Sequence, residues 1–367
     1  MGWVCATAVM LACVEDPPEP DFELRTKWFL LRGFDRSETE LCGGTIAWLD
    51  GYTDSLAHQL GLDEAPVATY DWYSHNAWTE LRPCPRGAGG CFWPDTIHAT
   101  DVPFEHEIVH AVLEQTYGNC VYFLSEGLAE LFGGPRTTEQ PAADIDVTVA
   151  EMIALSFSTT ARPTTSLYQR SRHFVSFLRF EYGLDRVLEL CAATPRGGTI
   201  AELEDAFVDV LGTPLPKVLA AYADYPVCDG IADRAKLYEC GGDPEVVLAP
   251  GDQHVFELDL SCAHPSAVGP RKGRFHVSTQ LRLLEDGVYS WSFDSSSDEV
   301  AFVDLTGARL SLEQCASCGE GAFGRVDVWT PEFIALPEWL PAGDYTLEIM
   351  LPLEFSGRVN LTFVGTP

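Results

Sequence analysis

Two histidines spaced four residues apart carry the clearest chemical signal in this chain. His106 and His110 belong to the string His-Glu-Ile-Val-His. Because four residues make slightly more than one helical turn, both imidazoles lie on one helix face and can reach a single metal ion. Glu107 follows the first histidine, where a carboxylate can take a proton from a metal-activated water. The string therefore predicts a metal centre, and zinc is the ion expected there.

The residues around this string argue against a purely structural role for the two histidines. Positions 108–109 and 111–113 are all apolar, which predicts a largely buried helix. Burying two imidazoles in such a helix without polar partners would cost free energy. A catalytic zinc site uses three protein ligands and keeps one position open. A third ligand is therefore expected from a nearby segment.

A second string, Ser-Glu-Gly-Leu-Ala-Glu at residues 125–130, follows a short distance downstream. Together the two strings resemble the gluzincin clan of zinc metallopeptidases, in which a glutamate of the next helix is the third ligand. The resemblance implies three zinc ligands, His106, His110 and Glu126. It also implies Glu107 as the general base. Glu130, one turn after Glu126, is expected to orient a histidine rather than to bind the metal.

The resemblance extends to residues 168–183 and covers roughly residues 28–225. Gluzincins often supply a tyrosine or histidine from a downstream helix to stabilise the oxyanion, which implies Tyr168 here, with His173 as the alternative. The family pattern has two small residues before Phe174, where this chain has Arg172 and His173. The shape of the cleft wall is therefore expected to differ from the family pattern.

Apolar runs before the first string predict a small sheet, with strands at residues 28–31, 67–72 and 96–100. Residues 96–100 are expected to be the edge strand along which an extended substrate lies. His98 within them is expected to be structural or substrate-lining rather than a metal ligand.

A helical lobe is expected to follow this sheet. The motif helix begins after Pro103, and further helical patterns span residues 41–60, 124–132, 147–157, 167–182, 185–191, 200–211 and 215–223. Gly127 and Ala129 are small enough for two helices to approach closely. Four arginines, Arg170, Arg172, Arg179 and Arg186, are expected to form ion pairs on the helix surface.

The pattern changes near residues 228–251, after which short apolar runs alternate with turn signals. Strands are predicted at residues 255–260, 273–284, 287–293, 299–305, 324–329, 343–351 and 358–364. This is typical of a β-sandwich. The predicted class is α+β, with a zincin-like unit (residues 25–232) and an all-β sandwich (residues 240–367), preceded by a leader and tether (residues 1–24).

Charge and cysteine content restrict partners and compartment. The 367 residues carry 23 Lys and Arg against 55 Asp and Glu, a net charge of −32, which argues against binding nucleic acid. Twelve cysteines, ten of them beyond the leading segment, suggest up to five disulfides and an oxidising compartment. Short separations favour four pairs: Cys84–Cys91, Cys315–Cys318, Cys240–Cys262 and Cys191–Cys228.

The first residues are typical of an export signal. Residues 1–14 carry no charge and are too few to span a bilayer. Residues 10–13, Met-Leu-Ala-Cys, resemble the lipobox of bacterial lipoproteins, which implies a lipid anchor at Cys13. No Lys or Arg precedes Arg25, so the usual basic start is missing and plain secretion remains an alternative. The acidic, proline-rich residues 15–23 suit a flexible tether.

The combined expectation is a zinc-dependent hydrolase of a peptide or protein substrate, located in the bacterial cell envelope or outside the cell. Two alternatives remain, a catalytically inactive zincin-fold protein and a lipoprotein whose β-sandwich binds a surface. Glu107 favours the enzyme, because a non-catalytic site has no chemical need for it.

Overall fold

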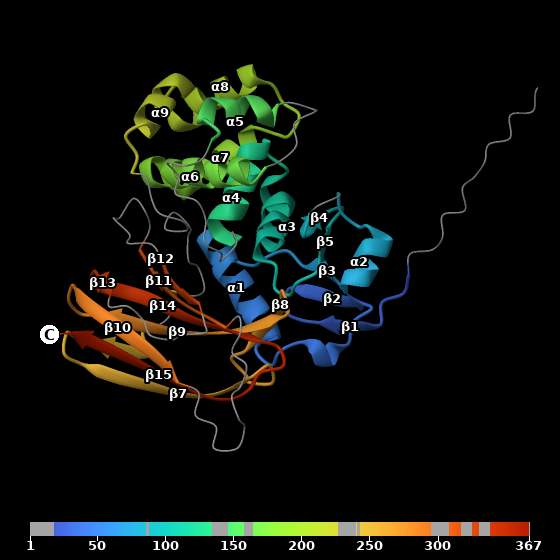
Figure 1. The fold of residues 1–367 in the computed structure, drawn as a ribbon. Helices are drawn as coiled ribbons and strands as arrows, with labels where there is room; N and C mark the ends of the chain where they lie inside the picture. The colour runs from blue at the N-terminus through green and yellow to red at the C-terminus, as the bar shows by residue number, and fades with distance from the viewer. Residues whose placement is uncertain are drawn as a thin grey trace, which may run out of the picture.

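Helices dominate the first two thirds of the chain and strands dominate the last third (Figure 1). The computed structural model describes residues 18–85, 88–133, 146–157, 164–226, 240, 243–294, 308–316, 325–329 and 338–366. Mixed helices and sheets, largely segregated along the chain, confirm the predicted α+β class at this level.

A five-stranded sheet begins the described chain. Its order is β1 (Phe22–Arg25), β2 (Phe29–Phe34), β3 (Ala68–Tyr73), β5 (Thr96–Ala99) and β4 (Gly90–Phe92). The strands β2, β3 and β5 are parallel, and the two outer strands are antiparallel to their neighbours. Both faces of β3 are largely buried, as expected for a central parallel strand.

The prediction that residues 96–100 form the edge strand of this sheet is wrong. The strand β5 pairs with β3 on one side and with β4 on the other, so β4 forms the edge. With only three residues, β4 is too short to show an alternating pattern. The expected tether also ends earlier than predicted, because β1 begins at Phe22.

Nine α-helices are found among the described residues, and all except α2, which was not predicted, agree in position with the helical patterns of the sequence. They are α1 (Thr45–Gln59), α2 (His75–Leu81), α3 (Glu105–Tyr117), α4 (Tyr122–Gly133), α5 (Val149–Ser156), α6 (Thr165–Tyr182), α7 (Leu184–Ala193), α8 (Ile200–Leu211) and α9 (Leu215–Tyr222). Capping boxes begin α5 at Thr148 and α8 at Thr199, which explains why these two helices start where they do. A short 3₁₀ helix, η1 (Glu38–Glu40), follows β2.

The strands of the last third form two further sheets. One has the order β13 (Glu338–Leu340), β10 (Gly287–Asp294), β15 (Ser356–Thr366) and β7 (Gln253–Ser261). The other has the order β12 (Arg325–Trp329), β11 (Arg309–Gln314), β14 (Gly343–Pro352), β9 (Arg274–Leu283) and β6 (Val246–Leu248), with β8 (Val268–Arg271) also paired to β9. Buried side chains of both sheets, such as Phe256 and Phe275, belong to one hydrophobic cluster.

Six of the seven predicted C-terminal strands coincide with β7, β9, β10, β12, β14 and β15. The strand predicted at residues 299–305 lies outside the described residues, as does the domain boundary predicted at residues 232–240 apart from Cys240. The sequence missed β6, β8, β11 and β13. Three of these are short, and β11 is buried at nearly every position, so none shows a clear alternation of exposed and buried residues.

Four disulfides join described residues, which fits an oxidising compartment. The predicted Cys84–Cys91 pair is confirmed. The other three predictions are wrong, because the observed pairs are Cys42–Cys262, Cys120–Cys191 and Cys240–Cys315. The fold brings together cysteines as far as 220 residues apart, so short separation was a poor guide to pairing.

The predicted export segment and the anchor cysteine at position 13 lie outside the described residues. Within the part of the chain that the structure describes, no helix is both long enough and apolar enough to cross a bilayer.

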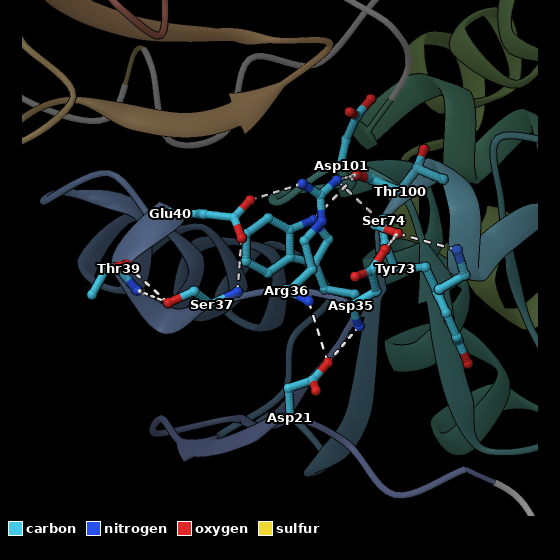
Figure 2. A network of polar contacts seen from close by, with 12 residues as sticks. Asp21, Asp35, Arg36, Ser37, Thr39, Glu40, Tyr73, Ser74, Thr100 and Asp101 are labelled. Atoms are coloured by element: carbon cyan, nitrogen blue, oxygen red, sulfur yellow. Dashed lines mark hydrogen bonds and ion pairs between the residues drawn. The ribbon is translucent and has the colours of Figure 1, made fainter.

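A polar network around Arg36 holds the ends of the parallel strands together (Figure 2). Arg36 donates to Glu40 Oε2 at 2.9 Å and to the carbonyl oxygens of Tyr73 and Thr100 at 3.2 Å and 3.5 Å. Its guanidinium lies 4.6 Å from the ring centroid of Trp72. Because Tyr73 ends β3 and Thr100 follows β5, Arg36 ties these strands where the chain turns toward the motif helix.

Candidate metal centre

The helices α3 and α4 carry the candidate metal ligands. Gly118, with a φ of 80°, ends α3, and a connection of only four residues leads to the start of α4. Such a short connection keeps the two helices in contact, and α4 also packs against α6 (Figure 1). Gly127 permits this second contact, since a methyl group there would lie 2.5 Å from Val175 Cγ2 and 2.7 Å from Ser171 O.

Three ligand atoms of the predicted site converge on one point. His106 Nε2 and His110 Nε2 lie 3.2 Å apart, and Glu126 Oε2 lies 3.2 Å from the first and 3.3 Å from the second. Within the described residues, these three side chains are the one group of three or more potential ligands close enough together to hold a metal ion. Tetrahedral zinc with ligand distances of roughly 2.0–2.1 Å separates neighbouring ligand atoms by roughly 3.3 Å. The observed spacing therefore fits a zinc ion.

The outer ring nitrogens of both histidines have polar neighbours. Glu130 Oε1 lies 3.0 Å from His106 Nδ1, as predicted from the sequence. Ser125 Oγ lies 3.3 Å from His110 Nδ1, and Glu114 Oε1 lies 4.0 Å from the same atom. An acceptor at Nδ1 holds the proton on that nitrogen and leaves the Nε2 lone pair free for a metal.

Electrostatics at this site favour positive charge. Burial alone would lower the pKa of His106, but hydrogen bonds to Glu126 and Glu130 raise it well above its usual value. Burial likewise opposes charging of His110, and the charge of Glu126 outweighs it, so the pKa of His110 is also raised. Burial would raise the pKa of Glu126, yet the two histidines lower it. The negative charge of the neighbouring carboxylates, which raises both histidine pKa values, would also attract a divalent cation.

Glu107, the residue between the two candidate ligands of α3 in the motif, lies against the edge strand β4. A methyl group added at Gly90 would lie 3.1 Å from Glu107 Cγ, so β4 passes directly over this side chain. Glu107 is only 7% exposed. Burial raises the pKa of its carboxyl, against the lowering effect of His106 and His110. A raised pKa suits a carboxylate that must accept a proton near neutral pH.

Tyr168, at the start of α6, lies beside the candidate ligands. Its ring centroid is 5.9 Å from that of His106, in an edge-to-face arrangement. Burial and the charge of Glu126 raise the pKa of its phenol to about 12, so the hydroxyl keeps its proton at neutral pH. Tyr168 therefore lies beside His106 with a hydroxyl that retains its proton.

His173, the alternative to Tyr168, is engaged elsewhere. Its Nδ1 lies 2.6 Å from Tyr222 Oη and its Nε2 lies 3.1 Å from Pro226 O. The ring also packs edge to face on Tyr222 and Tyr225. His173 therefore joins α6 to α9 and its following turn.

The structure separates the roles of three other predicted residues. His98 bonds Tyr73 Oη at 3.0 Å and Trp93 O at 2.8 Å, which confirms a structural role. Arg172 was predicted to pair on the helix surface, and this is wrong. It is 2% exposed, and its Nη1 lies 3.9 Å from Glu130 Oε2, beside the candidate ligand His106. Arg186, by contrast, makes the predicted surface pair with Glu189.

Sequence reasoning missed several neighbours of the site. The ring centroid of Tyr122 lies 6.3 Å from that of Tyr168, and burial raises the pKa of its phenol. Tyr122 precedes Glu126 by four residues, and Glu114 follows His110 by four, so helical spacing places each beside a predicted ligand. The same rule that joined His106 to His110 could have found both residues.

The sequence matches no protein-family model, and no curated protein was found to match it. A functional assignment therefore depends on the geometry of the candidate site.

Proposed function

We propose that this protein is a zinc-dependent peptidase of the gluzincin type. His106, His110 and Glu126 hold the zinc ion, and Glu107 is the general base. The triangle of ligand atoms with sides of 3.2–3.3 Å carries this proposal, because its size matches one face of a tetrahedral zinc site. The fit of Glu130 behind His106 supports it independently.

The chain's own residues divide the chemistry of hydrolysis among them. Zinc, when bound, supplies positive charge that acidifies a water molecule and polarises a peptide carbonyl. Glu107 accepts the proton released by this water and can pass it to the leaving amine. Tyr168 donates a hydrogen bond to the carbonyl oxygen as negative charge develops on it. Its raised pKa keeps that proton available.

The substrate is an extended peptide that adds to the free side of β4. This edge strand passes over Glu107, and the Cys84–Cys91 disulfide fixes its middle residue. Strand addition supplies main-chain hydrogen bonds whatever the side chains, and so orients a peptide across the site. The sheet and α-helical lobe correspond to a zincin-like unit, the two C-terminal sheets to a β-sandwich, and Cys13 to a lipid anchor.

A peptide-library cleavage assay tests the proposal, run on the zinc-loaded protein with and without a chelator. We expect cleavage that the chelator removes and that zinc restores. Glu107→Gln should keep one zinc ion per chain and lose at least about 100-fold in kcat. Glu189→Gln, the same change on the surface of α7, is the control and should match the unchanged protein. Cleavage by Glu107→Gln at the original rate would rule out Glu107 as the base.

A further inference from the structure

One segment of the C-terminal sheets reaches into the N-terminal unit. Residues 262–272, here called the β8 segment, contain β8 and the turn after it. Main-chain hydrogen bonds join Cys42, Gly43 and Gly44 to the carbonyls of Gly269, Cys262 and Ala267 at 2.8–3.0 Å. The Cys42–Cys262 disulfide links the same two segments covalently. The β8 segment is therefore bound to the start of α1 by both covalent and backbone contacts (Figure 1).

Small residues make this close approach possible. A methyl group at Gly43 would lie 2.8 Å from Ala263 O, and one at Gly44 would lie 2.5 Å from Pro265 O. Val268 of the β8 segment is buried in the hydrophobic cluster of the N-terminal unit, whereas Cys42 is buried in that of the C-terminal sheets. Each unit thus completes the core of the other at this junction.

The tip of the β8 segment meets the first turn of the motif helix. Arg271 forms an ion pair through Nη2 with Glu105 Oε1, and the two side chains are only 14% and 9% exposed. Its guanidinium carbon lies 5.8 Å from the ring centroid of Trp48 on α1. The backbone nitrogen of Lys272 donates to Asp101 Oδ1 at 2.8 Å, and that of Val102 donates to Pro270 O at 3.1 Å. The segment therefore holds the chain just before α3 as well as its first residue.

Glu105 is the first residue of α3 and directly precedes His106. This turn also packs on the end of α4, since a methyl group at Gly133 would lie 2.6 Å from both Glu105 O and His106 N. The helix α4 carries Glu126 and Glu130, which contact opposite nitrogens of the His106 ring. A shift of the first turn of α3 would therefore change the distances between His106 and both carboxylates.

We propose that Arg271 is a positioning residue for the metal centre. Through its buried ion pair with Glu105, it fixes the first turn of α3 against α4 and so sets the position of the His106 ring. The inference rests on the proposed zinc site but not on peptide hydrolysis. If Arg271 positions His106, the C-terminal sheets help to hold the proposed metal centre in place and are not an independent accessory unit.

The test uses the full chain, with zinc affinity measured by competition with a chromogenic chelator. Arg271→Gln should weaken zinc binding by about tenfold, the size expected for loss of an outer-shell contact. Glu105→Gln should weaken it equally, and the double variant should be no worse than either single change, because both remove one shared contact. Arg282→Gln, which breaks the exposed pair with Asp344 in the same sheets, is the control and should bind zinc normally.

Arg271→Lys separates positioning from folding. Lysine keeps the charge but lacks the planar fork of the guanidinium. We expect the thermal unfolding midpoint to be preserved while zinc affinity lies between those of the unchanged protein and Arg271→Gln. This variant decides the question if Arg271→Gln does not fold, as judged by circular dichroism. Unchanged zinc affinity in a folded Arg271 variant, or additive losses in the double variant, would overturn the inference.

The outcomes distinguish this inference from the proposed function. If the unchanged protein binds no zinc, both are contradicted. If it binds zinc and cleaves peptides, but the Arg271 variants bind zinc equally well, only the positioning role fails. If Arg271→Gln loses zinc affinity while no peptide is ever cleaved, the positioning role is supported and the peptidase proposal is contradicted.

Discussion

Glu130 Oε1 lies 3.0 Å from His106 Nδ1, while Glu126 Oε2 lies 3.2 Å from Nε2 of the same ring. The imidazole is thus held between two carboxylates from one helix, one turn apart on α4. In the proposed zinc site, Glu126 binds the ion together with His106, and Glu130 orients the ring. This difference in position predicts different consequences when each carboxylate is removed.

Replacing Glu126 should damage metal binding more than replacing Glu130. We expect Glu126→Ala to remove a direct ligand and lower zinc affinity by more than about 100-fold, and Glu130→Ala to lower it by about 10- to 100-fold. Elemental analysis of dialysed protein and competition titrations measure both. Equal losses, or a larger loss for Glu130→Ala, would reassign the third ligand.

Zinc affinity should fall as the pH falls, starting above the usual range for histidine. Zinc needs both Nε2 lone pairs, and the raised pKa values of His106 and His110 mean that protons occupy these nitrogens at higher pH than in a free histidine. Below both pKa values, two protons must leave per zinc bound, so each pH unit should cost about 100-fold in affinity. At higher pH the affinity should level off. Titrations from about pH 5 to about pH 9 check this, and a flat profile would contradict it.

Tyr168→Phe should reduce turnover without releasing zinc. The substitution keeps the ring against His106 and removes only the hydroxyl. We expect kcat to fall by about 100- to 1,000-fold, the usual effect of losing one oxyanion donor, with little change in KM. Tyr122→Phe, on the neighbouring ring, is the comparison and should have a smaller effect. An unchanged kcat in Tyr168→Phe would transfer the donor role to another residue.

Gly127→Ala should destabilise the fold, although alanine favours helices over glycine by about 1 kcal/mol. The added methyl group would lie 2.7 Å from Ser171 O, a backbone atom that no rotamer change can move away. Overpacking of this kind typically costs about 1–3 kcal/mol, and the gain in helix propensity offsets about 1 kcal/mol of it, so we expect a net loss of up to about 2 kcal/mol in the free energy of unfolding. Urea denaturation measures it. In Gly89→Ala the methyl group would lie 3.7 Å from the Phe104 ring, so this control should show little change.

Local spacing made much of the fold and the candidate site predictable. Helical periodicity located α1 and α3 to α9 within a few residues, and residues that are neighbours on one helix face, such as His106 and His110 or Glu126 and Glu130, could be assigned together. The prediction of Glu126 as a ligand depended on the resemblance of residues 125–130 to the gluzincin pattern, not on helical periodicity. Its approach to both histidines depends on the short turn between α3 and α4.

Contacts between distant segments were not predictable, because no periodicity relates residues that meet only after folding. The pairing of Cys42 with Cys262 and the choice of β4 as the edge strand both followed from chain topology. Burial of Arg172 beside Glu130 followed from the packing of α6 on α4.

By itself the sequence determined which residues can bind a metal and that they share helix faces, since the helical repeat is a local property of the chain. Only the tertiary structure decided that Glu126 lies at Nε2 of His106 and Glu130 at Nδ1. It also decided that β4 lies over Glu107 and that Arg271 contacts Glu105, 166 residues away in the sequence. These relationships depend on how packed elements cross in space, and the same local patterns are compatible with many such arrangements.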